Sequence, residues 1–347
     1  MSELSDLDPL PDVAPQEEPA DLVAEQRPPT PVEKPKEQPR PEPRVRRLNI
    51  IGRRNIFFAI SLLIIIPGIF SMVTRGFLLG IDFAGGTEFT INVASQPSVA
   101  QVESAVAADP LTSGGSVIQT GGSGYIIRAA PLTPQQQKLV EDHLTTRFGH
   151  IDVQQVLEVG PTIAGETIEF ALLAVVLASV AILFLLAIRF RNVPGGWRAG
   201  FQFGGSALAA LLHDVFLLTG IFSIIGRVMG LRIGEIDSLF VTAVLTVVGF
   251  SVHDTIVVFD RIRENLRVSQ RLSFEQVVNL SIMQTAARSI ITSFTVVLVL
   301  VAILIAGGAT LKGFALALLI GIVSGTYSSI FNASPLLVVW RRVQPLR

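Results

Sequence analysis

VVGFSVHDTIVVFDRIREN, residues 247–265, begins as an apolar run and ends as a charged one. His253 and Asp254 lie inside the apolar part, and Asp260 follows near the charged end. Ionisable side chains are rare in such runs unless they are paired or have a function. The stretch is therefore either a soluble core segment with a buried polar network or a membrane span that carries a functional charge.

The composition of the whole chain favours the membrane. Of its 347 residues 50% are hydrophobic and 16% are charged, whereas soluble proteins usually carry about 25% charged residues. A membrane-spanning helix needs about 20 consecutive apolar residues. Segments of that kind lie at approximately 56–79, 167–188, 201–225, 236–259, 287–306 and 314–340. They predict an α-helical polytopic membrane protein with six transmembrane helices.

The distribution of arginine predicts the orientation and the domains. Arginine is frequent before the first span, between the second and third spans, between the fourth and fifth spans, and after the last one. Cytoplasmic segments carry such an excess, so we expect both termini in the cytoplasm. Residues 1–47, rich in Pro and Glu, are expected to form a disordered cytoplasmic tail. Residues 48–79 form a basic anchor and the first span, 80–165 an exported domain, and 166–347 a five-helix bundle.

The exported segment has the pattern of a small α+β domain. We expect strands at 86–93, 152–159 and twice within 116–129, with helices at 98–108 and 133–148. The order β-α-β-β-α-β is the ferredoxin-like arrangement. The segment contains no cluster of His, Asp and Glu at metal-ligand spacing and no Ser-His-Asp grouping. We therefore expect a binding or lever module, with no metal and no cofactor.

GIDFAGGTEF, residues 80–89, is glycine-rich. It contains Gly80, Asp82, Gly85 and Gly86, but it lacks the Lys-Ser/Thr ending and the glycine spacing of nucleotide-binding loops. We interpret it as the junction at which the chain leaves the membrane and enters the exported sheet, where glycine permits close backbone approach.

The third and fourth spans each contain a His-Asp pair, His213-Asp214 and His253-Asp254. An unpaired carboxylate in hydrocarbon costs at least about 2.5–3.5 kcal/mol. Asp254 therefore faces the bundle interior, pairs with a cation or takes up a proton. Arg288, at the start of the fifth span, is the nearest cation in depth. A carboxylate that alternates between an arginine and a proton acts as a proton relay; the other interpretation is a static pair that fixes packing.

Three further polar features near the spans each have more than one interpretation. Asp260, near the membrane surface, is either a solvated ion-pair residue or part of the relay. Residues 273–289 have the pattern of an amphipathic helix that lies on or enters the cytoplasmic face. Ser324, Ser328 and Ser329 either line a wet path or form hydrogen bonds between helices, and we expect the second.

These motifs together resemble the SecF family of bacterial protein-export subunits, within the RND superfamily. The resemblance rests on GIDFAGGTEF after the first span, HDV in the third, GFSVHDTIVVFDRIREN through the fourth and QTAARSIITS entering the fifth. It covers roughly residues 50–340. It implies an RND-type half bundle of six helices with a small exported ferredoxin-like domain.

The resemblance also implies a function and partners. The family works with SecD beside the SecY-E-G channel, with YajC as a further partner, in the bacterial cytoplasmic membrane. There it uses the proton motive force to complete preprotein export. Its contacts are then membrane lipid and the translocating preprotein, without nucleic acid, and protons are the coupling ion.

By position, Asp254 and Arg288 match the proton-pathway residues of the family. Asp214, His213, His253 and Asp260 are then candidates for relay or support. His253 stands where the family commonly has Asn. It either joins the relay or replaces the hydrogen bond of the amide, and we favour the replacement.

Two rival functions remain at this point. An RND-type exporter of a small molecule or lipid has the same architecture, but it usually carries two six-span halves and larger exported domains. An intramembrane aspartyl protease also needs two aspartates on adjacent spans, as Asp214 and Asp254 are. This chain lacks the Y-D and G-x-G-D motifs of those proteases. We therefore expect a proton-coupled transport subunit rather than an enzyme.

Overall fold

The computed structural model describes residues 48–268 and 271–345. The expected disordered tail, 1–47, lies outside the described residues. Within them, six helical segments are long and apolar enough to cross a membrane, so the prediction of a six-helix membrane protein is confirmed. The helices are α1 (Arg54–Arg75), α5 (Pro161–Arg189), α6 (Gly196–Ser223), α7 (Ser238–Val268), α8 (Phe274–Ala306) and α9 (Ala309–Ser328), the last continuing through a π-helical turn into α10 (Ser334–Val343).

Helix α8 joins two segments that the sequence predicts separately. The helix expected over 273–289 does not lie on the surface as a separate element but continues into the fifth span, and one helix runs from Phe274 to Ala306. Its start is fixed by Ser273, whose side chain accepts from the Gln276 amide while the Gln276 side chain accepts from the Ser273 amide, a capping box. Its first turns bury Val278 and Ile282 in the bundle core. The apolar face of this segment is therefore covered by neighbouring helices.

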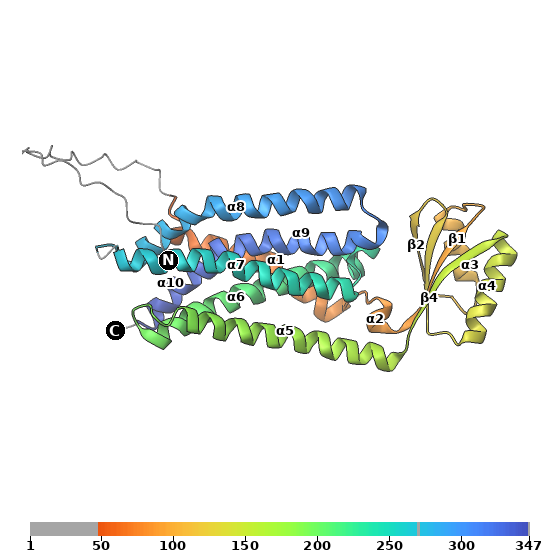
Figure 1. Cartoon of the computed structure of the whole chain (residues 1–347), viewed down its shortest axis with the longest axis horizontal. Coiled ribbons are helices and arrows are strands. Elements are labelled where there is room, and N and C mark those ends of the chain that lie inside the picture. Colours follow the sequence, from red (N-terminus) through yellow and green to blue (C-terminus); the bar gives the residue numbers. More distant parts are fainter. Residues whose placement is uncertain (1–47, 269–270, 346–347) are drawn as a thin grey trace, which may run out of the picture. The chain divides into compact units, whose positions relative to one another are not determined.

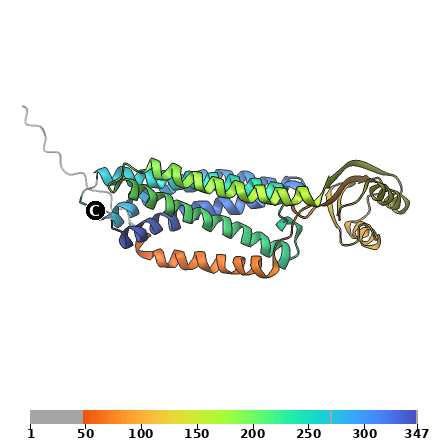
Figure 2. The ribbon, with the colours of Figure 1, turned by 90° about the horizontal axis from the view of Figure 1, so that it is seen from below.

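The bundle is organised around α6, α7 and α9 (Figure 1). Helix α7 packs against α8 and α9, and α6 packs against α5, α1 and α9. Figure 2 shows α1, in orange, along one flank of the bundle. It approaches α6 closely where Gly68 meets Gly220, since a Cβ atom on Gly220 would lie 2.7 Å from the Cα of Gly68.

The segment between α1 and α5 begins with the one-turn helix α2 (Ile81–Ala84) and then forms a four-stranded antiparallel sheet with the two helices α3 and α4. The elements are β1 (Gly86–Val93), α3 (Val99–Ala108), β2 (Ser116–Gly121), β3 (Gly124–Ala129), α4 (Pro134–Phe148) and β4 (Ile151–Val159). The strand order is β2-β3-β1-β4. Phe89, Ile91 and Ile127 project from the central strands into a buried core with Val102 of α3 and Val140 of α4. The alternation of apolar residues in β1 therefore predicts both its limits and its buried face.

Candidate functional site

Asp214 of α6 is a buried carboxylate surrounded by hydrogen-bond donors. It is 1% exposed. Ser324 and Ser328 of α9 each donate to it at 2.6 Å, and Ser251 of α7 donates at 2.7 Å. The Nδ1 atom of its neighbour His213 lies 3.0 Å away. Two partners per oxygen fix this carboxyl group between three helices. As expected, Ser324 and Ser328 form hydrogen bonds between helices.

Asp254 of α7 is almost as deeply buried but has far weaker contacts. It is 3% exposed. Its carboxyl group is approached by the hydroxyls of Ser293 on α8 at 3.5 Å and Thr326 on α9 at 3.4 Å. These distances are longer than those of strong hydrogen bonds, which for hydroxyl donors are about 2.7–2.8 Å. The protein therefore satisfies the charge of Asp214 far better than that of Asp254.

The two aspartates do not form a dyad. Asp214 faces α9 and Ser251, whereas Asp254 faces Ser293 and Thr326. Among the described residues, no hydrogen bond joins the two carboxyl groups. An aspartyl dyad shares one proton between adjacent carboxyls, and this geometry does not provide that arrangement.

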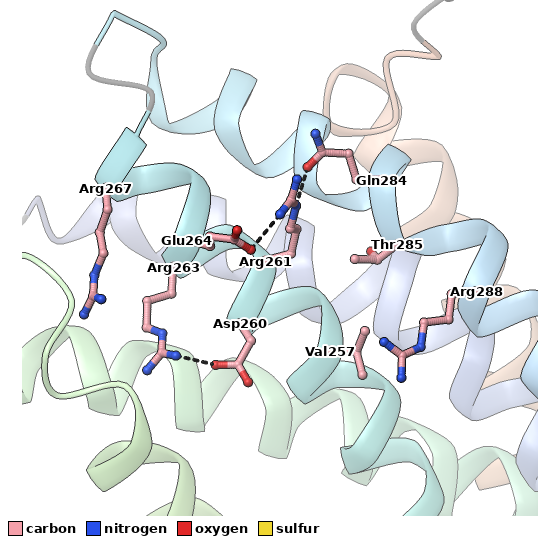
Figure 3. Close-up of a pocket in the computed structure, with 9 residues that line it drawn as sticks. All are labelled: Val257, Asp260, Arg261, Arg263, Glu264, Arg267, Gln284, Thr285 and Arg288. Atoms are coloured by element: carbon pink, nitrogen blue, oxygen red, sulfur yellow. Dashed lines mark hydrogen bonds and ion pairs between the residues drawn. The ribbon is translucent and has the colours of Figure 1, made fainter. Parts of the chain in front are cut away.

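Arg288 lines a cleft of about 790 Å³ between α7 and α8. In Figure 3 its side chain extends from α8 toward Val257 on α7. Val257 follows Asp254 by three residues, so the cleft ends about one helical turn from the buried carboxyl. Over the described chain, no ion pair joins Asp254 to Arg288. The structure thus places Arg288 in a cleft that ends about one turn of α7 from Asp254, but it does not pair the two predicted relay residues.

Asp260 lies in the same cleft and is paired with arginines. It forms ion pairs with Arg189 of α5 at 2.9 Å and with Arg263, one turn along α7, at 3.3 Å. Arg261 in turn contacts Glu264 and Gln284, each at 2.6 Å. The charges at this end of α7 are therefore largely neutralised by neighbours (Figure 3).

The two histidines lie in different surroundings. His213 is mostly enclosed, and its ring stacks on Tyr327 with centroids 6.4 Å apart. His253 is exposed on the side of α7 that points away from the bundle. Neither the described hydrogen bonds nor the described ion pairs include His253, so its part in proton transfer stays a prediction.

The glycine-rich junction connects the sheet to the start of α7. Gly80 donates its amide to the Ile236 carbonyl at 2.8 Å, and the Asp82 carboxylate accepts from the amide of Ser238, the first residue of α7, at 2.8 Å. Gly85 has a φ of +73°, which favours glycine. A Cβ atom on Gly86 would lie 2.6 Å from the Ala129 carbonyl. The motif is thus a structural joint rather than an anion-binding loop.

Arg128 and Glu235 form a second connection that the sequence alone does not reveal. Arg128 of β3 contacts Glu88 of β1 at 2.6 Å and also forms an ion pair with Glu235, between α6 and α7. Burial raises the pKa of Glu235 above its ordinary value, although Arg128 acts in the opposite direction. Burial likewise raises the pKa of Asp237. No sequence motif marks Arg128 or Glu235, because single charged residues are ordinary in strands and loops.

The residues that the structure describes contain no group of three or more His, Asp or Glu side chains placed to hold a metal ion.

Comparisons with known proteins identify the class to which this architecture belongs. Residues 139–343 match the family described as "Protein export membrane protein SecD/SecF, C-terminal", and residues 70–96 match the "SecD/SecF GG Motif". The six-helix bundle and its glycine-rich junction are thus those of a SecD/SecF-type integral membrane protein.

Individual relatives narrow this class. A protein translocase subunit SecF from Thermobaculum terrenum is 45% identical, over 86% of this chain and 96% of the relative. Another from Anaerolinea thermophila is 41% identical, over 84% and 94%. The crystal structure of SecDF from Thermus thermophilus, a translocon-associated membrane protein, matches with a TM-score of 0.73 and 32% identity, over 85% of this chain and 39% of that one. The chain belongs to the SecF family of protein translocase subunits.

Proposed function

We propose that this chain acts with a SecD partner to complete preprotein export across the bacterial cytoplasmic membrane, driven by the proton motive force. The observation that carries the proposal is the contrast between its two buried aspartates. Asp214 is held by short hydrogen bonds, whereas Asp254 has two long ones. A weakly satisfied buried carboxyl favours its neutral form, so Asp254 is the group suited to take up and release a proton.

The position of Arg288 fits one state of such a cycle. A protonated Asp254 needs no cation, and here Arg288 extends into the cleft. A deprotonated Asp254 attracts a guanidinium group, and Arg288 lies about one turn away along the α7–α8 interface. We infer that Arg288 moves between the cleft and Asp254 as the carboxyl loses and gains its proton. Asp260 then supports this site through its ion pairs with Arg189 and Arg263. His213 supports it through its contact with Asp214.

A partner chain is supported by the exposed sides of α7 and α8. Thr242, Thr246 and His253 of α7 and Arg288 and Thr292 of α8 are all exposed. A charged or strongly polar side chain is costly against lipid, so this face suits a second membrane protein. The longer SecDF chain, of which this chain covers 39%, supports SecD as that protein.

The remaining parts of the proposal follow from the family and from charge. The arginine-rich ends support a cytoplasmic position for both termini, with the four-stranded sheet on the outer side. Its element order is that of a ferredoxin-like domain. There it contacts the translocating preprotein beside SecY-E-G, with YajC as a further neighbour, and the apolar faces of α1 and α5 contact lipid. Protons are the coupling ion, without a bound cofactor.

Replacing Asp254 tests the proposal. Asp254→Asn and Arg288→Met, each expressed with the SecD partner, are expected to abolish export that depends on the proton gradient while the protein remains inserted and bound to its partner. Asp152→Asn, an exposed carboxylate on β4, is the matched control and is expected to export normally. Unchanged export with Asp254→Asn would overturn the assignment.

A further inference from the structure

Four hydroxyl residues follow one face of α8 at intervals of four: Ser281, Thr285, Ser289 and Ser293. We call them the hydroxyl column. All four are buried, with 0, 8, 1 and 5% of their surface exposed. Residues four apart on a helix have Cβ atoms about 5–6 Å from each other, which is a separation that one water molecule bridges. The column thus follows the buried side of α8.

The two ends of the hydroxyl column reach two different environments. Ser293 contacts the Asp254 carboxyl and also lies 2.5 Å from the Thr326 hydroxyl. Thr285 lines the cleft between α7 and α8 that also contains Arg288. The residue between them is Ser289. It is therefore the one member placed between the buried carboxyl and the cleft.

Ser289 differs from its neighbours in its hydrogen bonds. Ser281 donates to the Val277 carbonyl at 2.8 Å, and Thr285 donates to the Ser281 carbonyl at 2.9 Å. The Ser289 hydroxyl is fully buried beside the Asp254 carboxyl, but it makes no hydrogen bond of standard geometry among the described residues. A buried hydroxyl without a good hydrogen bond costs about 1–3 kcal/mol, so a further polar group beside Ser289 would stabilise it. Water from the adjacent cleft has the required size and polarity.

The geometry points to Ser289 as the residue that passes the proton of Asp254 to the cleft. This inference rests on the proposed relay function of Asp254. The O–H bond of the protonated carboxyl breaks, and its proton goes to the Ser289 hydroxyl oxygen or a water bound to it. That oxygen releases its former proton to the next water, beside Thr285, and remains a neutral hydroxyl. The net change is one proton moved from Asp254 to water in the cleft.

An isosteric pair of variants tests the role of the hydroxyl. Ser289→Thr and Ser289→Val have nearly the same shape, and only Thr keeps the oxygen. The full chain with its SecD partner is reconstituted in vesicles, and proton release on the cleft side is followed with a pH-sensitive dye under an imposed gradient. Ser289→Val is expected to reduce the proton flux about tenfold or more, and Ser289→Thr is expected to retain it. Thr219→Val, an isosteric change on α6, is expected to have no effect.

Two further measurements separate the possible failures. Equal melting temperatures of the Ser289 variants would show that lost flux does not arise from lost packing. If Asp254→Asn keeps its flux, the proposed relay fails. If Asp254→Asn loses flux while Ser289→Val keeps it, the relay stands and the role of Ser289 is overturned. Equal losses in Ser289→Thr and Ser289→Val would also overturn that role, because volume would then be the cause.

Discussion

Arg128 of β3 forms an ion pair with Glu235 in the segment between α6 and α7. The same guanidinium group binds Glu88 of β1, so one side chain connects the sheet to the segment that precedes α7. Asp82 reaches the first residue of α7 beside it. The sheet is thus attached to the helix that carries Asp254.

Replacing Arg128 should therefore destabilise the protein. Arg128→Met leaves Glu235, 8% exposed, with only the more distant Arg232, 4.0 Å away, and the expected loss of unfolding free energy is about 1–3 kcal/mol. Melting temperature in detergent is the measurement. Arg147→Met, on the exposed side of α4, should leave it unchanged. Adding Glu235→Gln to Arg128→Met should recover part of the loss; no recovery would show that the ion pair is not the cause.

Glu235 should also make stability depend on pH. Its pKa is raised by burial from an ordinary value of 4.5, so the folded state holds this proton more tightly than the unfolded chain. The stabilising contribution is complete below pH 4.5 and is lost as the pH rises through the raised pKa. Melting curves from pH 4.5 upward should show this decline, and Glu235→Gln should reduce its slope.

The fall of melting temperature with pH should not vanish in Glu235→Gln, because burial also raises the pKa of Asp237. Arg128→Met should steepen it, since Arg128 lowers the pKa of Glu235. A shallower slope in Arg128→Met would contradict the assignment.

The two buried aspartates should differ in their effect on stability. Asp214→Asn places an amide NH₂ group among donors that need an acceptor, at an expected cost of about 1–3 kcal/mol. Asp254→Asn disrupts two contacts of 3.4 and 3.5 Å and should cost less. Thermal unfolding of both variants, measured in the same detergent, checks the order. A larger loss in Asp254→Asn would show that Asp254 is the structural aspartate.

The contact between α1 and α6 should not tolerate a side chain. Gly220→Ala brings a Cβ atom to 2.7 Å from the Cα of Gly68, so the helices must separate, and the expected cost is about 1–3 kcal/mol. Gly160→Ala, at a position with open space around it, is the control. If Gly220→Ala and Gly160→Ala have the same melting temperature, α1 can shift away from α6 at little cost in stability.

Much of the fold could be predicted from local patterns. Apolar length gives the spans, and the alternation in Gly86–Val93 gives β1 at its observed limits. The continuation of α8 from its first turns into the span could not be predicted in this way. Its polar residues have partners far along the chain, such as Asn265, which donates to Ser281 at 2.8 Å, and Arg342, which pairs with Glu275. Polar residues whose partners are distant resemble a surface helix when the sequence is considered alone.

The candidate site was predictable in its residues but not in their roles. A charge within an apolar run singles out Asp214 and Asp254. The difference between them depends on Ser324, which lies 110 residues from Asp214 along the chain, and on Ser293 of α8. Only packing determines which carboxyl receives strong donors. The ion pair between Arg128 and Glu235 likewise depends on packing, because the two residues are far apart in the sequence.

The unbroken course of α8 has a mechanical consequence. Its 33 residues extend about 50 Å at 1.5 Å per residue, well beyond a hydrocarbon layer about 30 Å thick. Because the helix is continuous, a tilt at one end also displaces the residues nearer the other end. A force on its first turn, where Glu275 is tied to Arg342, would be transmitted along the same helix to Ser289 and Ser293. The cytoplasmic-side contact of α8 and the surroundings of the buried carboxyl are therefore coupled through one helix.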